Sequence, residues 1–180
     1  MRTFICIASG PSLTPADCEL VSRSGFPIVA VNSTWRAVPD CHYIYAADRS
    51  WWDKYHPTIT TAAERWTCSM GAALKYGLNY FPHPDRASFN SGQRAIQLAA
   101  RLGAMRVLLL GYDCSIENGR HWHGDHPGDL KNPDACSVER WHAEFSRVLP
   151  ALPGLEVINC SRRSALSCFP FSTIEKALHA

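Results

Sequence analysis

Short apolar runs recur along the chain, and each of them ends in polar or turn-forming residues. The runs are rich in β-branched and aliphatic side chains and lack strict alternation with polar residues, as is typical of strands buried on both faces of a parallel sheet. They cover residues 3–8, 27–31, 42–47, 106–110 and 155–158. We therefore expect these five segments to be strands of one largely parallel sheet.

Helical patterns lie between some of these runs. The clearest covers residues 91–102, where Asn90 can act as the N-cap, Gln93 can complete a capping box and Gly103 provides a stop. A second helix is expected over 137–149 and a short one over 15–22. Strand–helix alternation of this kind predicts an α/β fold, a single Rossmann-like three-layer sandwich with a mostly parallel sheet that spans residues 1–180.

The segment from about 114 to 136 breaks this pattern. It is rich in glycine and proline and contains few apolar residues. A loop of this length in a compact domain is usually functional, as a lid or a binding loop. We expect it to be an active-site loop.

Composition narrows the class of protein. The chain has 180 residues, of which 46% are hydrophobic and 19% charged, with a net charge of +2. This balance is typical of a globular domain and not of a dedicated duplex-DNA binder, although a nucleic acid remains open as an acceptor. No apolar stretch approaches a membrane span, and the first apolar run lacks a signal-peptide cleavage region, so we expect a cytoplasmic protein without a membrane partner.

Small or polar residues follow the predicted strands. Because the carboxyl ends of parallel strands meet at one edge of the sheet, where open α/β folds bind ligands, these residues predict a polar cleft. Ordinary turns would use the same residue types, so that alternative stays open. The residues are Ser9, Gly10, Pro11 and Ser12 after the first run, Asn32 and Ser33 after the second, Asp48 after the third, Asp113 after the fourth and 159–161 after the last.

Two of these segments suit a phosphate. In the first turn, Gly10 has no Cβ and would let the backbone approach a ligand, while Ser12 or Thr14 could cap the following helix. Backbone N–H groups at such a turn favour an anion. Another helix begins with small residues, at Asn90, Ser91 and Gly92. These residues could let a ligand approach the start of that helix, or they could serve only as its cap.

The long loop contains the sequence His121-Trp122-His123-Gly124-Asp125-His126. Imidazoles and carboxylates in this pattern suit zinc or iron, with His121, His123, Asp125 and His126 as the ligands. The flanking sequence differs from that of metallo-β-lactamase-like hydrolases, where the motif directly follows a strand and leads into a helix. A general base, His123 or His126, is the alternative to a metal site, and a structural role is the third.

Aromatic and basic residues supply further candidates for substrate contacts. Trp51 and Trp52 could stack on a base or sugar or belong to the core. Arg162 and Arg163 follow the last predicted strand and could clamp an acidic group or form a solvated turn.

Four short patches together resemble the bacterial sialyltransferases of glycosyltransferase family 42. The resemblance extends to the related domain of unknown function 115, to 6-hydroxymethylpterin pyrophosphokinase-like proteins and to small uncharacterised proteins carried in phage genomes. It covers most of the chain. The patches are Ile7-Ala8-Ser9-Gly10-Pro11-Ser12-Leu13, Val31-Asn32-Ser33, Asn90-Ser91-Gly92 and Val107-Leu108-Leu109-Leu110-Gly111-Tyr112-Asp113.

The resemblance implies a nucleotide-dependent transferase. Ser9, Gly10, Asn32, Ser91 and Gly92 would contact a nucleotide or nucleotide sugar, no metal would be required, and a loop histidine would deprotonate the acceptor hydroxyl. The family has Asn where this chain has Ser9, and its phosphate-stabilising tyrosine pair has no clear counterpart here. The compartment would be the host cytoplasm if a phage encodes the chain.

Three alternatives to glycosyl transfer remain. A pyrophosphokinase-like enzyme would need Mg²⁺ and carboxylates, for which Asp48 and Asp113 are available. A non-catalytic protein could bind or sequester a nucleotide, and a metal-dependent hydrolase could use the histidine loop. A homo-oligomer is compatible with each of these functions.

Overall fold

The computed structural model describes residues 2–83, 90–126, 128, 130 and 132–180. Its centre is a seven-stranded sheet in the order β5-β4-β3-β2-β1-β6-β7 in which every pair of neighbours is parallel. The strands are β1 (Thr3–Ile7), β2 (Ile28–Val31), β3 (Tyr43–Tyr45), β4 (Glu64–Thr67), β5 (Asn79–Tyr80), β6 (Arg106–Leu110) and β7 (Glu156–Asn159). The predicted α/β sandwich with a parallel sheet is confirmed.

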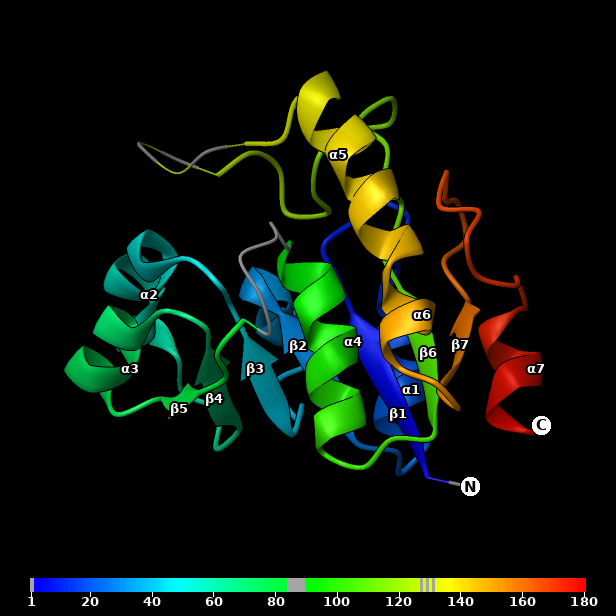
Figure 1. Cartoon of the computed structure of the whole chain (residues 1–180), viewed down its shortest axis with the longest axis horizontal. Helices are drawn as coiled ribbons and strands as arrows, with labels where there is room; N and C mark the ends of the chain where they lie inside the picture. Colours follow the sequence, from blue (N-terminus) through cyan, green and yellow to red (C-terminus); the bar gives the residue numbers. More distant parts are fainter. Residues whose placement is uncertain (1, 84–89, 127, 129, 131) are drawn as a thin grey trace.

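Helices cover both faces of this sheet (Figure 1). One face packs against α4 (Ser91–Arg101), α5 (Ala135–Ser146) and α6 (Val148–Ala151). The other packs against α1 (Pro15–Ser22), α2 (Arg49–Tyr55), α3 (Met70–Tyr76) and α7 (Ile174–Leu178). Two 3₁₀ helices, η1 (Asn32–Arg36) and η2 (His56–Thr58), complete the chain.

Strand β1 shows why the sequence forms three layers. Its side chains alternate between the two cores, so that Phe4 and Cys6 face α4 while Ile5 and Ile7 face α1. All five of its residues are buried. A strand that must be apolar on both faces can only sit in the middle of such a sandwich, which explains the unbroken apolar run.

The helix ends follow local rules with two differences from expectation. The helix predicted over 137–149 is divided into α5 and α6, with Arg147 between them. Thr14 caps α1 and forms a capping box with Asp17. Asn90 caps α4 by accepting from the Gln93 N–H at 2.8 Å. The predicted capping box at Gln93 is wrong, because its side chain instead donates to the Glu144 carbonyl at 2.8 Å and joins α4 to α5.

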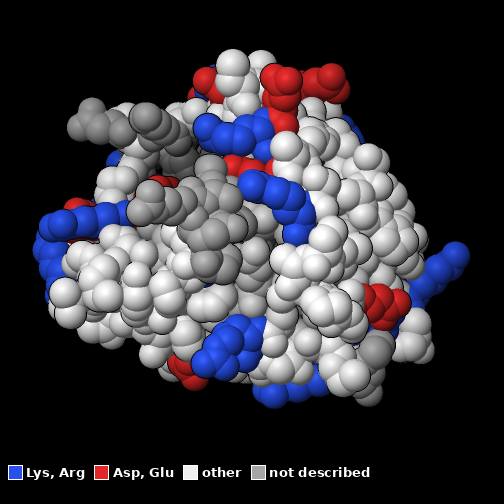
Figure 2. Space-filling model, viewed as in Figure 1, with Lys and Arg blue, Asp and Glu red and all other residues white. Residues whose placement is uncertain are grey.

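Three general features bear on the class of protein. All eight cysteines are free, and five of them are buried. Within the part of the chain that the structure describes, no helix combines the length and apolar composition needed to span a bilayer. Charged side chains of both signs are distributed over the face shown in Figure 2, with uncharged surface between them.

Candidate functional site

The strand order has one point of reversal, at β1, and a ligand-binding crevice is expected there at the carboxyl edge of the sheet. The chain builds β1 to β5 outward in one direction and then returns to place β6 on the other side of β1. Such a reversal is the point at which open α/β folds bind ligands. The loops that meet there follow β1 and β6, the second being the long loop predicted to be functional.

The β1 and β6 loops are held in direct contact by two glycines. Gly10 donates its N–H to the Gly111 carbonyl at 2.8 Å. A Cβ on Gly10 would lie 2.2 Å from an Asp113 carboxylate oxygen, and one on Gly111, whose φ is +68°, would lie 2.4 Å from the Ala8 carbonyl oxygen. The expectation that Gly10 makes room for a ligand is therefore corrected, because the group that approaches it is the β6 loop itself.

Ser12 and Asp113 form the second connection between these loops. The Ser12 N–H and hydroxyl donate to the two carboxylate oxygens of Asp113 at 2.9 and 2.6 Å. Burial raises the pKa of Asp113, although the Ser12 hydrogen bonds and the nearby Arg163 charge oppose the rise. Beside them is a cavity of about 260 Å³ lined by Pro11, Ser12, Asp113, Asn118 and Arg163.

These contacts use the backbone donors of the first turn. The Gly10 and Ser12 N–H groups bond to the β6 loop, the Leu13 N–H bonds to the Gly10 carbonyl at 3.1 Å, and Pro11 has none. The turn thus closes the junction between β1 and β6 rather than offering these N–H groups to a phosphate. We correct the prediction of a phosphate-binding turn at Gly10–Ser12 accordingly.

A cluster of three histidines lies on top of this junction. The Ser9 hydroxyl and His121 Nδ1 are 2.7 Å apart, and the Trp122 N–H donates to the Ser9 carbonyl at 2.8 Å, so the loop is tied to the end of β1. The rings of His121, His123 and His126 have centroids 4.6 to 5.1 Å apart. One ring nitrogen from each residue lies within 4.8 Å of the other two.

The electrostatic surroundings keep these imidazoles neutral. Burial, followed by the neighbouring histidines, lowers the pKa of His121 to about 4. Burial also lowers the pKa of His123, with Arg36 as the next cause, and that of His126, with His123 and then Lys54 as further causes. Asp125 opposes these shifts at His121 and His126, but its carboxylate pairs with Arg120 at 2.7 Å. The structure thus groups the three histidines without Asp125.

The residues that follow β2 and β3 also lie at the carboxyl edge of the sheet, but not all of them are available to a ligand. Asn32 has a φ of +51°, an uncommon left-handed conformation that Asn tolerates better than most residues. Ser33 is buried and accepts from the Trp51 indole at 3.2 Å. The prediction that Trp51 and Trp52 stack on a substrate is wrong, because they are only 3% and 0% exposed and pack in the core.

The residues at the start of α4 also contact other parts of the protein. The Asn90 amide donates to the Glu144 carboxylate at 2.7 Å, and the Ser91 hydroxyl accepts from the Ala47 N–H at 3.2 Å. A Cβ on Gly92 would come within 3.1 Å of the Tyr112 ring. These contacts correct the expectation that Gly92 makes space for a nucleotide, since the space is filled by Tyr112 and Phe145.

The carboxylates proposed for Mg²⁺ are separated by the sheet. Asp48 is exposed at the start of α2, after β3, whereas Asp113 is buried after β6. Three inter-strand steps of about 4.8 Å put these strand ends roughly 14 Å apart. This distance does not favour a shared Mg²⁺, so the pyrophosphokinase-like alternative gains no support here.

Arg162 and Arg163 have different surroundings. Arg162 is bound to Asp17 by three hydrogen bonds of 2.8 to 3.2 Å and holds the β7 loop against α1. Arg163 lines the small cavity beside Asp113. Of the predicted arginine clamp, only Arg163 therefore faces a cavity.

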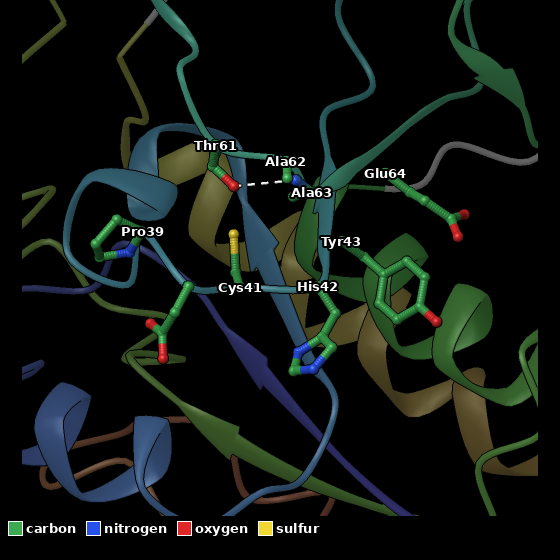
Figure 3. A pocket seen from close by; sticks show the side chains of 9 residues that line it. Pro39, Cys41, His42, Tyr43, Thr61, Ala62, Ala63 and Glu64 are labelled. Carbon is green, nitrogen blue, oxygen red and sulfur yellow. Dashed lines mark hydrogen bonds between the residues drawn. The ribbon is translucent and has the colours of Figure 1, made fainter.

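A larger cavity of about 390 Å³ lies at the opposite, amino edge of the sheet (Figure 3). It is formed by the segments that lead into β3 and β4, including Cys41, His42 and Glu64. Burial raises the pKa of the Cys41 thiol to about 12, and His42 Nδ1 accepts from the Ile28 N–H at 3.2 Å. Neither group is poised as a nucleophile or base, so the candidate site remains at the carboxyl edge.

Two basic residues of the site were not predicted from the sequence. Arg36 in η1 and Lys54 in α2 both act electrostatically on His126, although neither was singled out. Arg36 also lies over the rings of Trp35 and Tyr55, 5.6 and 5.0 Å from their centroids. The available signal was the position of Arg36 four residues after Asn32, since both belong to the loop after β2.

Comparison with known proteins adds no assignment. No family model, curated protein or solved structure matches the chain.

Proposed function

We propose that the protein is a nucleotide-dependent transferase, namely a glycosyltransferase that uses a nucleotide-sugar donor. The supporting observation is that a cluster of neutral histidines lies at the carboxyl edge of a parallel sheet beside the cations of Arg36 and Lys54. A proton acceptor next to positive charge is the combination that transfer from a phosphorylated donor requires. The four patches that resemble family 42 also lie at this edge or in the segments that lead to it.

In this proposal, each group has a defined role in the reaction. His123 or His126 takes the proton of the acceptor hydroxyl as its O–H bond breaks. The acceptor oxygen forms a bond to the anomeric carbon while the bond from that carbon to the phosphate oxygen breaks. The bonding electron pair leaves with the phosphate, whose charge is balanced by Arg36 and Lys54. His121 positions the loop through its contact with Ser9.

Nucleotide binding tests the first half of this proposal. We expect at least one of CMP, CDP, UDP and ADP to stabilise the protein, with a rise in Tm of roughly 5 °C or more at a hundredfold excess over Kd. Arg36→Gln should reduce the shift. Arg23→Gln is the matched control, because that exposed arginine pairs with Glu19 on α1 away from the site. If none of the four nucleotides changes Tm, the proposal is wrong.

Turnover tests the second half. Release of free nucleotide from the matching nucleotide sugar should slow by about a hundredfold in His123→Gln or His126→Gln, as expected for loss of a general base. The nucleotide-induced Tm shift should persist in the slower variant. Binding without any release by the unmodified protein would instead indicate a non-catalytic nucleotide-binding protein.

A further inference from the structure

We infer that His121, His123 and His126 form a binding site for a borderline transition metal, with Zn²⁺ as the first candidate. The inference does not depend on the proposed function, and it changes one role in it. A histidine whose nitrogen lone pair holds the metal cannot also take the proton of the acceptor hydroxyl, so in the metal-loaded protein His123 and His126 act as ligands. It departs from the metal-free expectation drawn from the family resemblance. The geometric basis is that three imidazole nitrogens lie within 4.8 Å of one another.

The first line of evidence is the hydrogen bonding of the three rings. Among the residues that the structure describes, His121 Nε2, His123 Nε2 and His126 Nδ1 are buried atoms without a hydrogen-bond partner. Buried polar atoms are nearly always paired, so three unpaired nitrogens in neighbouring rings require an explanation. A metal ion satisfies all three at once, because neutral imidazole binds metal through a nitrogen lone pair.

The second line of evidence is the separation of the nitrogens. Zinc–nitrogen bonds of about 2.0–2.1 Å in a tetrahedron place the ligand atoms about 3.3 Å apart. The observed limit of 4.8 Å is therefore larger than the bound geometry by at most about 1.5 Å. A bound ion would therefore draw the three nitrogens together by up to about 1.5 Å. An all-nitrogen set suits zinc, copper or nickel and not Mg²⁺ or Ca²⁺, which prefer oxygen.

The third line of evidence is the outer contact of His121. Metal-binding histidines usually donate their second ring N–H to an oxygen that fixes the tautomer. The 2.7 Å contact between His121 Nδ1 and the Ser9 hydroxyl supplies this arrangement and leaves Nε2 for the metal. Ser9 is then a positioning residue for the ligand and not a nucleotide contact.

The surrounding charges indicate which kind of ligand would occupy the fourth coordination position of the metal ion. Among the residues that the structure describes, Arg36, Lys54 and Arg120 are the cations that act on these rings, and Asp125, paired with Arg120, is the acid. Three neutral imidazole ligands do not compensate the positive charge of the ion. An anionic oxygen ligand is therefore favoured there, such as hydroxide, an ionised acceptor hydroxyl or a phosphate oxygen. A three-histidine site with one open position is typical of catalytic zinc.

Metal content is the direct test. The full chain, without a histidine tag, is purified after growth with added zinc and analysed by elemental mass spectrometry. We expect about one zinc per chain in the unmodified protein, as for a single three-histidine site. His123→Gln should lower the zinc affinity at least tenfold, and His179→Gln, which alters an exposed histidine outside the cluster, should leave it unchanged. Thermal unfolding and near-ultraviolet circular dichroism verify that each variant is folded.

Cobalt substitution identifies the ligands. Co²⁺ added to the metal-free protein should give the visible bands of a tetrahedral site without the near-ultraviolet band of cobalt–thiolate bonds. A thiolate band would place the metal on cysteines and overturn the assignment, and Cys136→Ser tests the exposed cysteine. Ser9→Ala should weaken cobalt binding by about ten- to a hundredfold, and Ser9→Thr should restore it.

Two results would refute the metal site. One is a folded protein that binds neither zinc nor cobalt above background, and the other is a His123→Gln variant that binds metal as tightly as the unmodified chain. Nucleotide-induced stabilisation in either case would leave the proposed function standing. Stoichiometric metal without any nucleotide effect would support the metal site and reject the nucleotide-dependent function.

Discussion

Replacement of Gly111 by alanine tests the connection between the β1 and β6 loops. Gly111 has a φ of +68°, and an added Cβ would lie 2.4 Å from the Ala8 carbonyl oxygen. Two costs are therefore expected, one for the left-handed backbone and one for the displaced β1 loop. Gly25 provides a matched control, since its φ is +75° and an added Cβ would meet no atom within 4 Å.

The difference between the two variants isolates the steric cost. Gly25→Ala should lower the free energy of unfolding by about 1–2 kcal/mol, because this is the cost of an alanine in the left-handed backbone region. Gly111→Ala incurs the same cost. It also strains the hydrogen bonds from the Ala8 N–H to the Leu110 carbonyl and from the Gly10 N–H to the Gly111 carbonyl, of 2.9 and 2.8 Å. At about 1 kcal/mol for each bond, the total reaches about 3–4 kcal/mol.

Urea unfolding, followed by circular dichroism, measures both variants against the unmodified chain. At roughly 2–4 °C per kcal/mol for a chain of this size, Gly111→Ala should also lower Tm by about 6–16 °C. Equal destabilisation by the two substitutions would show that the close contact at Gly111 carries no energetic weight. The account of the β1–β6 junction would then be wrong.

Three further predictions concern the residues around this junction. Ser12→Ala should lower the free energy of unfolding by about 1.5–3 kcal/mol, because Asp113 loses its hydroxyl donor; urea unfolding measures the loss, and no change would mean that the 2.6 Å bond is unimportant. Burial alone would raise the pKa of Asp17, but the hydrogen bonds and charge of Arg162 outweigh it and hold that pKa below its usual value. Asp17→Asn should therefore destabilise the protein at pH 7. The loss of stability relative to the unmodified chain should be complete above about pH 4 and should disappear as the pH falls through the lowered pKa of Asp17. Unfolding measured at pH 7 and at pH 3 would show or contradict this dependence. Trp51→Phe should lower stability by about 1–3 kcal/mol while leaving nucleotide-induced stabilisation unchanged, since the indole lies in the core; a lost ligand effect would return Trp51 to the site.

The buried strands were predictable because their environment is uniform. Strand β6 was expected at the residues where it occurs, and β1, β2, β3 and β7 were found within one or two residues of expectation. Strands β4 and β5 were missed because the first contains Glu64 and Arg65, while both residues of the second, Asn79 and Tyr80, are exposed. A strand near the sheet edge carries little of the apolar signal on which the prediction depends.

The site was only partly predictable from the sequence. The spacing of His121, His123 and His126 indicated metal or proton chemistry, and the structure brings their rings together. Contacts over long sequence distances carry no local signal, and these decide the roles of the neighbouring groups. Ser9 meets His121 across 112 positions, and Ser12 meets Asp113 across 101. The sequence left both a substrate contact and a core position open for Trp51 and Trp52, because a buried helix face and a ligand-binding surface use the same residue types.

The position of β1 in the sheet has a consequence for how the protein is made. Its two partners are separated widely along the chain, with β2 beginning at Ile28 and β6 at Arg106. During synthesis, one backbone edge of this fully buried strand stays unpaired until the second partner leaves the ribosome. An unpaired apolar edge is a template for pairing with another chain. Truncated chains that end before Arg106 should therefore aggregate, and the histidine loop should acquire its native contacts only late in folding.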